Sequence, residues 1–383
     1  MSANSIGEDD ENEYYQTDDF YLLSMEEAIA AFQKQGLQEP YVYRAISNLQ
    51  KIVDKCNVDI PMGGQHYPEY PSADILAQIE EICMQGWQEK ILGRVGDETK
   101  YVERYKTELY MLERMDYLNY FLLTWDILTY CDSVGILRGP GRGSVGGSLV
   151  AYLMGITAID PVKYNLVFER FAHLERITPC DIDNDIQASR RPEVIEYIKN
   201  KYGHVYQVRT INYVGIKAAI QRAGQALKIL PSEVDVYSKN FGSETTFLDL
   251  PHKELRALAS KFIGLIQNFG VHASAILVFP SSPNQWCAIE KQGDNFVAGL
   301  DYHFLEEQGL LKIDILGLKE LDIIGETLKN IPDKVDINNL PIEDEKTVQL
   351  LRQGKTLGIF QLESQGMTEL LVKLKPVGFI DVA

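Results

Sequence analysis

The sequence lacks the patterns that identify secreted, membrane-spanning and zinc-binding proteins. Its five cysteines are far apart and form no CxxC pair, which is typical of free thiols in a reducing compartment. Its six histidines also occur singly, which argues against a local zinc or iron cluster and a metallohydrolase. No stretch approaches the roughly 20 apolar residues of a membrane span, and residues 1–16 do not resemble a signal peptide. These absences predict a cytoplasmic location.

A surplus of positive charge is also missing. The net charge of -18 argues against nonspecific binding of nucleic acid over the whole surface, because phosphate affinity comes largely from Lys and Arg. Any contact with DNA must therefore be local. One basic stretch surrounds a glycine-rich loop and an acidic cluster, which favours a functional role over an ordinary solvated face. It contains Arg138, Arg142, Arg170, Arg176, Arg190, Arg191 and Lys201.

The residues that are present indicate a globular chain with two or three cores. The hydrophobic content is 45% and the charged content 24% over 383 residues. An acidic tail at 1–18 is expected to be disordered, because like charges repel and nothing apolar nearby can be buried. Ser24 and Glu27 predict a capped helix start in the segment that follows. Longer helices are expected at 73–92 and 99–114, after a connector rich in Gly and Pro.

Farther along the chain, apolar β-rich runs alternate with helices. The best strands are residues 274–279 and 310–316, which are dense in β-branched and apolar residues. Residues 211–269 are predicted to be mainly helical and separate two strand-rich parts. The expected fold class is therefore α+β, in the broad sense mixed α/β, with an inserted helical subdomain and helical segments at both ends.

Residues 181–185 read DIDND and form the sharpest local signal. In a β-strand, side chains two residues apart share a face, so this spacing points two or three carboxylates the same way. An exposed turn or a calcium loop is the alternative. The EF-hand pattern does not fit, because no glycine stands at its sixth position and Pro192 occupies its twelfth.

A second acid stands in a strand-like run at Asp314. Lys312 is two residues earlier, so the ammonium and the carboxylate are expected on one face of a buried strand. An ion pair within a core would explain them. The functional hypothesis is that Asp314 joins Asp181 and Asp183 around two divalent ions, while Lys312 faces the phosphate of a substrate.

Residues 139–148 read GPGRGSVGGS and precede the apolar helix pattern LVAYLMGI. Five glycines in ten residues let backbone N–H groups approach an anion, and the N-terminus of the following helix would add a favourable partial charge. The run is not a Walker A loop, and its GxGxxG match alone is weak evidence for dinucleotide binding. A structural glycine turn is the alternative.

Taken together and in order, these segments resemble the C-family bacterial replicative DNA polymerases. The matching runs are GPGRGSVGGSLVAYLMGITAIDP, YNLVFERF, DIDND, LLKIDILGL and GIFQLESQGM, with closely similar spacing. The resemblance begins at about Phe20 and reaches the last residue. It implies a palm of the nucleotidyltransferase type with an inserted helical thumb. The implied divisions are an acidic tail at 1–18, a helical linking segment at 19–60, palm at 61–210 and 270–320, thumb at 211–269 and the start of the fingers at 321–383.

The resemblance also implies residue roles. Asp181, Asp183 and Asp314 fall on the family's three metal-binding aspartates, and Lys312 falls on its strand lysine. Two Mg²⁺ ions are implied, with Mn²⁺ able to substitute; one would activate the primer 3′-OH and the other would steady the pyrophosphate. Asp185 is expected not to contact a metal. The implied substrate-binding residues are Arg142, Gly143 and Ser144 of the glycine loop, with Arg170 and Arg176 nearby.

Three departures from the family pattern stand out. Residues 179–186 read PCDIDNDI, in which the proline lies one place early and isoleucine replaces phenylalanine, while the aspartates keep their register. The family's N-terminal PHP domain is missing. The sequence also stops where the fingers begin, which predicts a poor polymerase on its own.

Primer-template DNA and dNTP are the expected ligands. A second polypeptide is expected to carry the rest of the fingers and the C-terminal domains, and through it a sliding clamp. A noncatalytic assembly piece of a replication complex and a divalent-metal nuclease are the alternatives; the nuclease would have no need for the glycine loop or Lys312.

Overall fold

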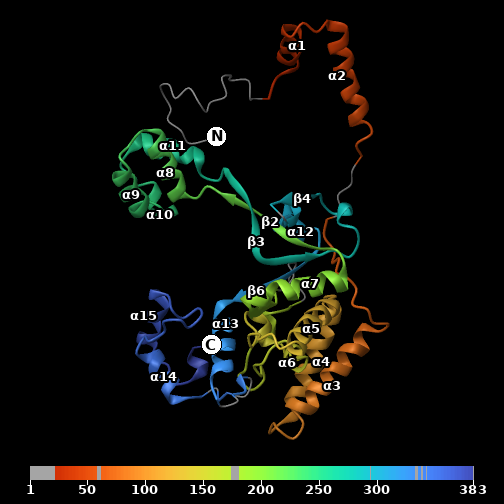
Figure 1. Cartoon of the computed structure of the whole chain (residues 1–383), viewed down its shortest axis with the longest axis vertical. Coiled ribbons are helices and arrows are strands. Elements are labelled where there is room, and N and C mark those ends of the chain that lie inside the picture. Colours follow the sequence, from red (N-terminus) through yellow and green to blue (C-terminus); the bar gives the residue numbers. More distant parts are fainter. Residues whose placement is uncertain are drawn as a thin grey trace. The chain divides into compact units, whose positions relative to one another are not determined.

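The computed structural model describes residues 22–57, 62–173, 181–293, 295–332, 335–337, 340–341 and 343–382. The chain divides into two compact units (Figure 1). Unit 1 comprises the described parts of 1–61 and 212–268, and unit 2 those of 62–211 and 269–383. Among the helices of the described ranges, none is both long and apolar enough to cross a lipid bilayer.

Unit 1 is built mainly from helices. Ser24 caps its first helix, and the Glu27 carboxylate accepts a hydrogen bond from the Ser24 N–H, so the predicted capping box is confirmed. Gly224 lets two helices pack closely, because a Cβ there would lie 2.4 Å from the Val234 side chain. The helices of this unit are α1 (Met25–Lys34), α2 (Glu39–Val53), α8 (Ile216–Ala226), α9 (Pro231–Asn240), α10 (Glu244–Phe247) and α11 (Lys253–Phe262).

The prediction that 211–269 is mainly helical is confirmed, although strands occupy both ends of the segment. Strand β2 (Val205–Tyr213) continues into this segment, and strand β3 (Ile266–Val278) begins inside it. Gly264, with a φ of 80°, reverses the chain after α11. Its N–H donates to the Val214 carbonyl at 3.0 Å, so the apolar run after the helix extends as strand instead of completing another turn.

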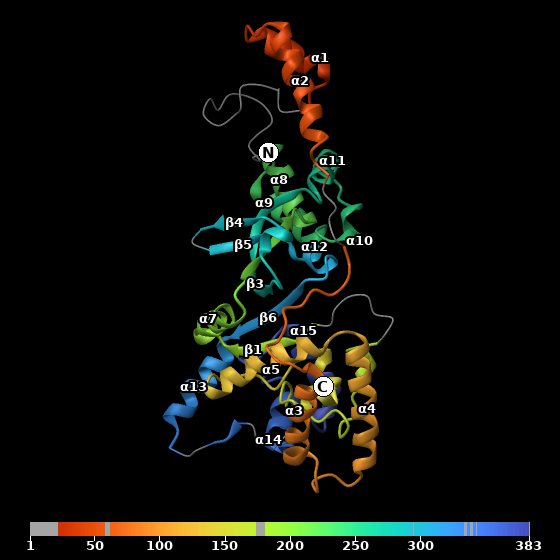
Figure 2. The same ribbon diagram turned by 90° about the vertical axis from the view of Figure 1, so that its right-hand side faces the viewer.

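Unit 2 contains a large helical layer packed on a sheet (Figures 1 and 2). Helix α5 is apolar on most of its surface and nine of its side chains are buried, which places it inside this layer. The helices expected at 73–92 and 99–114 are confirmed as α3 and α4. The helices of this unit are α3 (Ile75–Lys90), α4 (Glu98–Arg114), α5 (Leu118–Ser133), α6 (Leu149–Leu153), α7 (Arg191–Tyr202), α12 (Tyr302–Glu307), α13 (Lys319–Asn330), α14 (Glu345–Arg352) and α15 (Gln365–Leu374), with short 3-10 turns η1 (Ser144–Gly147), η2 (Phe168–Arg170), η3 (Ala188–Arg190), η4 (Pro283–Gln285) and η6 (Phe379–Asp381).

The sheet has six strands in the order β1-β6-β3-β2-β5-β4. Strand β1 runs parallel to β6, and β2 runs parallel to β5, whereas β3–β6 and β4–β5 are antiparallel. A mixed sheet with helices confirms the expectation of a mixed α/β fold. The remaining strands are β1 (Asp183–Gln187), β4 (Ile289–Gln292), β5 (Asn295–Asp301) and β6 (Leu311–Leu318).

Alternation along the strands gives the sheet two different faces. Ile276 and Ile313 belong to the large cluster formed with the helices α3 to α7. Ala275 and Leu277 belong to a smaller cluster with Leu305 and residues of β2 and β5 on the opposite face. Because residues two apart share a face, β6 buries its isoleucines under the helices and turns its polar side chains the other way.

Candidate functional site

The acidic residues meet where β1 and β6 lie side by side. Asp183 is directly opposite Asp314 in this parallel pair, so their side chains share one face of the sheet. Asp181 immediately precedes β1. The buried hydroxyl of Tyr120 accepts a hydrogen bond from the Ile182 N–H at 2.8 Å, which fixes the backbone that presents these acids.

Lys312 joins two of these acids. Its Nζ lies 3.3 Å from an oxygen of Asp181 and 3.3 Å from an oxygen of Asp314. The two oxygens are therefore separated by no more than twice that distance. The structure brings Asp181, Asp314 and Lys312 together although about 130 residues of sequence separate the two acids.

The glycine loop supplies a second cation to the site. Arg142 binds Asp185 through two hydrogen bonds of 2.9 and 3.0 Å, and its guanidinium lies 3.2 Å from Asp183. The loop runs antiparallel to β1, with backbone bridges from Arg142 to Asp183 and from Arg138 to Ile186. The expected sharing of a face by alternate aspartates is thus confirmed for Asp183 and Asp185, which face the same guanidinium.

The electrostatics of the site reflect crowding of like charges. Burial raises the pKa of Asp183 above its usual value; Arg142 lowers it, whereas Asp314, Asp185 and Asp181 raise it. Burial lowers the pKa of Lys312, but the surrounding carboxylates outweigh that effect and leave it above the ordinary lysine value. The ammonium is therefore firmly charged at neutral pH.

Four residues around the acids were not found from the sequence. Glu306 of α12 lies 3.4 Å from Lys312 Nζ, and the Tyr302 ring lies 5.2 Å from the same atom. Ser274 donates a hydrogen bond to Asp314 at 3.2 Å, and the His272 Nδ1 accepts from the Ala275 N–H at 2.9 Å. His272 and Ser274 are two residues apart on β3, and this spacing in the sequence predicts side chains on one face of a strand. Glu306, a single acid in a short helix, belongs to no such pattern.

The glycine loop lies against both the acids and the helical layer. Gly141 has a φ of 93°, and a Cβ there would lie 2.7 Å from the Thr157 side chain. Gly143 has a φ of 81°, and its missing Cβ would lie 3.5 Å from an Asp183 oxygen. Ser144 follows at the start of η1. Both glycines therefore meet a local steric requirement, and Gly143 stands beside the Asp183 carboxylate.

The expectation that the following helix would offer its N-terminus to an anionic ligand is wrong. The buried carboxylate of Glu108 accepts hydrogen bonds from the Ser148 hydroxyl at 2.9 Å and the Val150 N–H at 3.1 Å. Burial raises the pKa of Glu108, while hydrogen bonds from Arg104 and from the helix N–H groups lower it. The positive end of α6 is thus satisfied from within the chain.

Most of the basic stretch is also satisfied internally. Arg170 is exposed in η2, next to the glycine loop because η2 packs against η1, and Arg176 lies outside the described residues. The stretch is therefore less available for DNA than its composition indicated. The internal partners are Asp132 for Arg138, Asp183 and Asp185 for Arg142, Glu193 for Arg190, the Ile315 and Ser274 carbonyls for Arg191, and Asp126 for Lys201.

The carboxylate oxygens are suitable ligands for a divalent cation. Hard cations such as Mg²⁺ prefer oxygen ligands, and a cation would relieve the repulsion that raises the pKa of Asp183. In the arrangement present, Arg142 and Lys312 neutralise these acids. Within the ranges that the structure describes, no three Asp, Glu, His or Cys side chains are grouped closely enough to hold a metal ion. A metal ion would therefore compete with two protein cations for the same oxygens.

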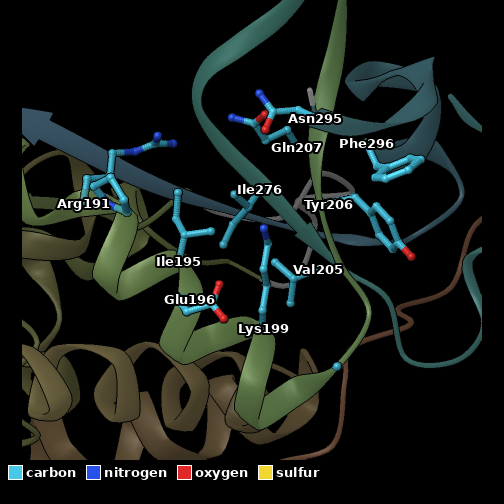
Figure 3. Close-up of a pocket in the computed structure, with 12 residues that line it drawn as sticks. Arg191, Ile195, Glu196, Lys199, Val205, Tyr206, Gln207, Ile276, Asn295 and Phe296 are labelled. Atoms are coloured by element: carbon cyan, nitrogen blue, oxygen red, sulfur yellow. The ribbon is translucent and has the colours of Figure 1, made fainter. Parts of the chain in front are cut away.

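A separate cavity of about 570 Å³ lies on the α7 side of the sheet (Figure 3). Arg191, Glu196 and Lys199 border it from α7, and Gln207 and Asn295 border it from the strands. The cavity belongs to the face that carries Ile276, whereas Asp314 pairs with the neighbouring residue of β3 and faces the other way. The acids and this cavity are therefore distinct sites.

Comparison with known proteins places most of the chain in two family models. Residues 77–317 match the bacterial DNA polymerase III alpha NTPase domain, and residues 320–383 match the bacterial DNA polymerase III alpha subunit finger domain.

Curated relatives named DNA polymerase III subunit alpha match over most of this chain. The relative from Bacillus subtilis is 34% identical over 359 residues, covering 87% of this chain and 32% of its own length. The relative from Halalkalibacterium halodurans is 33% identical over 392 residues (95% and 34%), and that from Escherichia coli is 31% identical over 376 residues (88% and 32%). The chain thus spans about a third of the length of these relatives.

Proposed function

Because the chain belongs to the bacterial DNA polymerase III alpha subunit family, we propose that it carries the nucleotidyl-transfer site of a replicative DNA polymerase. In this reaction the primer 3′-oxygen forms a bond to the α-phosphorus of a dNTP, the bond to the β-phosphate oxygen breaks, pyrophosphate leaves, and the 3′-hydroxyl proton passes to solvent. The observation that supports this proposal best is the pairing of Asp183 with Asp314 across β1 and β6, beside the glycine loop.

Two Mg²⁺ ions are proposed cofactors, with Mn²⁺ able to substitute. Asp181, Asp183 and Asp314 would hold them, and when bound they would lower the pKa of the primer 3′-OH and offset the charge on pyrophosphate. Ser274 would keep the Asp314 carboxylate oriented through its hydrogen bond. Asp185 is proposed not to bind metal, because both of its oxygens accept hydrogen bonds from Arg142.

The protein cations are proposed to bind phosphate. Lys312 would exchange part of its contact with the carboxylates for a phosphate oxygen, and Arg142 lies on the loop that would hold the triphosphate through Gly143 and Ser144. Arg170 would add positive charge close to this loop, and Arg176 is proposed as a further substrate-binding residue. This exchange would leave no charge unpaired. An incoming magnesium–nucleotide complex brings cations for the carboxylates and phosphates for Lys312 and Arg142.

The proposed ligands and partners follow from the proposed reaction. Primer-template DNA and dNTP are the substrates; unit 2 would carry the palm and the start of the fingers, and the helices of 212–268 would form the thumb. Since the chain spans about a third of its relatives, we expect weak polymerase activity from it alone. A second polypeptide with the rest of the fingers and the C-terminal domains would restore full activity and recruit a sliding clamp.

The proposal is tested by titrating the purified chain with Mn²⁺ in the presence of dATP and following free Mn²⁺ by electron paramagnetic resonance. We expect two bound ions, loss of binding in Asp183→Asn, and little change in the matched variant Asp185→Asn. Near-ultraviolet circular dichroism of both variants verifies that the fold is kept. Equal Mn²⁺ binding by wild type and Asp183→Asn would contradict the proposed metal site.

A primer-extension assay then separates catalysis from a structural role. Slow, template-directed extension that Asp183→Asn abolishes supports the polymerase. Absence of both metal binding and extension favours the noncatalytic assembly piece, a role that the internal ion pairs of Arg142 and Lys312 would fit. Extension at rates typical of complete polymerases would contradict the expectation of weak activity from this chain alone.

A further inference from the structure

Two adjoining cavities form a groove bordered by the start of the glycine loop, and neither is lined by the acids of β1 and β6. Their volumes are about 700 and 430 Å³, and they share Lys90, Arg94, Tyr152 and Ala158. Arg138 and Pro140 of the loop segment border the larger cavity, whereas Lys163 borders the smaller one. We name this feature the rear groove.

The rear groove concentrates positive charge in a chain whose net charge is -18. Lys90, Arg94, Arg138 and Lys163 line it. Lys90 Nζ donates to the Tyr152 carbonyl at 2.5 Å and lies 4.8 Å from the centre of the Tyr152 ring. Its charge is thus held by a carbonyl and an aromatic ring, both weaker partners than a carboxylate.

The acids that line the rear groove have partners of their own, and Asp132 offsets the charge of one of its four cations. Asp132 binds Arg138 through hydrogen bonds of 2.8 and 2.9 Å. Asp160 accepts hydrogen bonds from the Tyr101 hydroxyl at 2.8 Å and from the backbone N–H groups of residues 162 and 163. Glu89, which is exposed, remains near Lys90. Burial lowers the pKa of Lys90; Glu89 raises it, and Arg138 lowers it. An anion would stabilise the charged form of this lysine.

A buried hydroxyl supplies a second, independent observation. Thr157 lines the larger cavity and is only 2% exposed, yet its Oγ1 has no hydrogen-bond partner among the described residues. Buried polar groups are almost always paired, and an unpaired one costs about 1–3 kcal/mol. Its oxygen has almost no accessible surface, so the cavity wall would have to shift before a ligand oxygen could pair with this hydroxyl.

We propose that the rear groove binds the phosphate groups of a nucleic-acid strand or of a free nucleoside polyphosphate. Phosphate oxygens accept hydrogen bonds from ammonium, guanidinium and hydroxyl groups alike, and these are the groups that line the groove. The cations extend over both cavities, which fits several successive phosphates. This site goes beyond the proposed nucleotidyl-transfer site, whose carboxylates and Lys312 do not line it.

The proposal is tested on the full chain in EDTA at low salt, so that no divalent ion links a probe to the carboxylates. One probe is inorganic tripolyphosphate, measured by calorimetry, and the other is a fluorescein-labelled oligothymidylate, measured by anisotropy. The double variant Arg94→Gln/Lys163→Gln removes two exposed cations. We expect about a tenfold weaker affinity for each cation removed.

Two single variants sharpen the test. Thr157→Val replaces the unpartnered hydroxyl by a methyl group of similar size, so we expect an unchanged or higher melting temperature. Lys106→Gln, an exposed lysine on α4 away from the groove, is the matched control and is expected to bind as wild type does.

Competition between the probes identifies the source of phosphate. If tripolyphosphate binds weakly and displaces the oligonucleotide only at high excess, a strand is the ligand; tight binding with ready displacement indicates a free polyphosphate. The proposal is overturned if neither probe binds, or if binding is lost in Lys312→Met but not in Arg94→Gln/Lys163→Gln. The Mn²⁺ titration is independent of these measurements, so either site can fail alone.

Discussion

Replacing Lys312 by methionine gives the sharpest test of the charge balance in the acidic site. The substitution keeps an unbranched side chain over the Tyr302 ring but removes the ammonium that lies 3.3 Å from both Asp181 and Asp314. Three carboxylates, including Glu306, then lose their shared positive partner. We expect unit 2 to be destabilised at neutral pH.

The size of the effect follows from burial. The side chains of Lys312 and Asp314 are 10% and 11% exposed, whereas Asp181 is 60% exposed. Breaking a buried ion pair costs about 3–5 kcal/mol, and an exposed pair contributes about 0–1 kcal/mol. The pair with Asp314 therefore dominates, and after allowance for its residual exposure we expect a loss of about 2–4 kcal/mol in the free energy of unfolding.

The pH dependence of this loss has a definite sign. Burial already raises the pKa of Glu306, and Lys312 lowers it, so removal of Lys312 should raise the pKa of Glu306 further in the folded state. An acid whose folded pKa is raised destabilises the fold above that pKa, and this cost disappears as the pH falls through it. The difference between variant and wild type should therefore narrow in acid.

Urea denaturation followed by tryptophan fluorescence measures this loss. Trp87, Trp125 and Trp286 all lie in unit 2, so the signal follows that unit. Lys329→Met is the control, because Lys329 forms an exposed pair with Glu326 and should cost less than about 1 kcal/mol. If Lys312→Met costs no more than Lys329→Met, the ion pairs in the site do not stabilise the fold and the reasoning fails.

Three further substitutions or modifications test other parts of the molecule. Gly141→Ala should destabilise unit 2 by about 1–3 kcal/mol in the same assay, because its φ is 93° and its Cβ would collide with a neighbour. Tyr120→Phe leaves the Ile182 N–H without its acceptor and should cost about 1–3 kcal/mol, with faster hydrogen exchange of that amide. Cys83, whose pKa burial raises to about 12, should resist Ellman's reagent in the native chain at pH 9, whereas the exposed Cys56 reacts rapidly.

Matched controls accompany these measurements. Gly146→Ala should be tolerated, since a Cβ there meets no atom within 4 Å and its φ is not in the left-handed region. The thiol measurement uses a Cys180→Ser background, so that the reacting thiol can be assigned. Rapid labelling of Cys83 in folded protein, or an unaffected Gly141→Ala, would contradict the packing described above.

The parts predicted well from the sequence depend on local periodicity. The alternation in residues 181–185 directs Asp183 and Asp185 to one guanidinium, and the spacing of Lys312 and Asp314 places both on one face of β6. Strand geometry alone dictates these relations, because side chains alternate whatever the strand packs against.

The parts predicted poorly depend on contacts between distant segments. Glu108 and Ser148 are 40 residues apart, and no local pattern shows that a buried carboxylate occupies the start of α6. Arg142 likewise lies 43 residues from Asp185, so composition alone showed its charge but not its partner. Local sequence patterns therefore predicted the positions of the acids. The internal ion pairs of the nearby cations could be identified only from the folded structure.

The course of residues 138–142 along β1 has a consequence for the solubility of the protein. Strand β1 is the last strand of the sheet on its side, and an uncovered last strand offers free backbone groups to another chain. The bridges at Arg138 and Arg142 shield this border. Substitutions that displace the segment should therefore promote self-association, so light scattering ought to accompany every activity measurement on such variants.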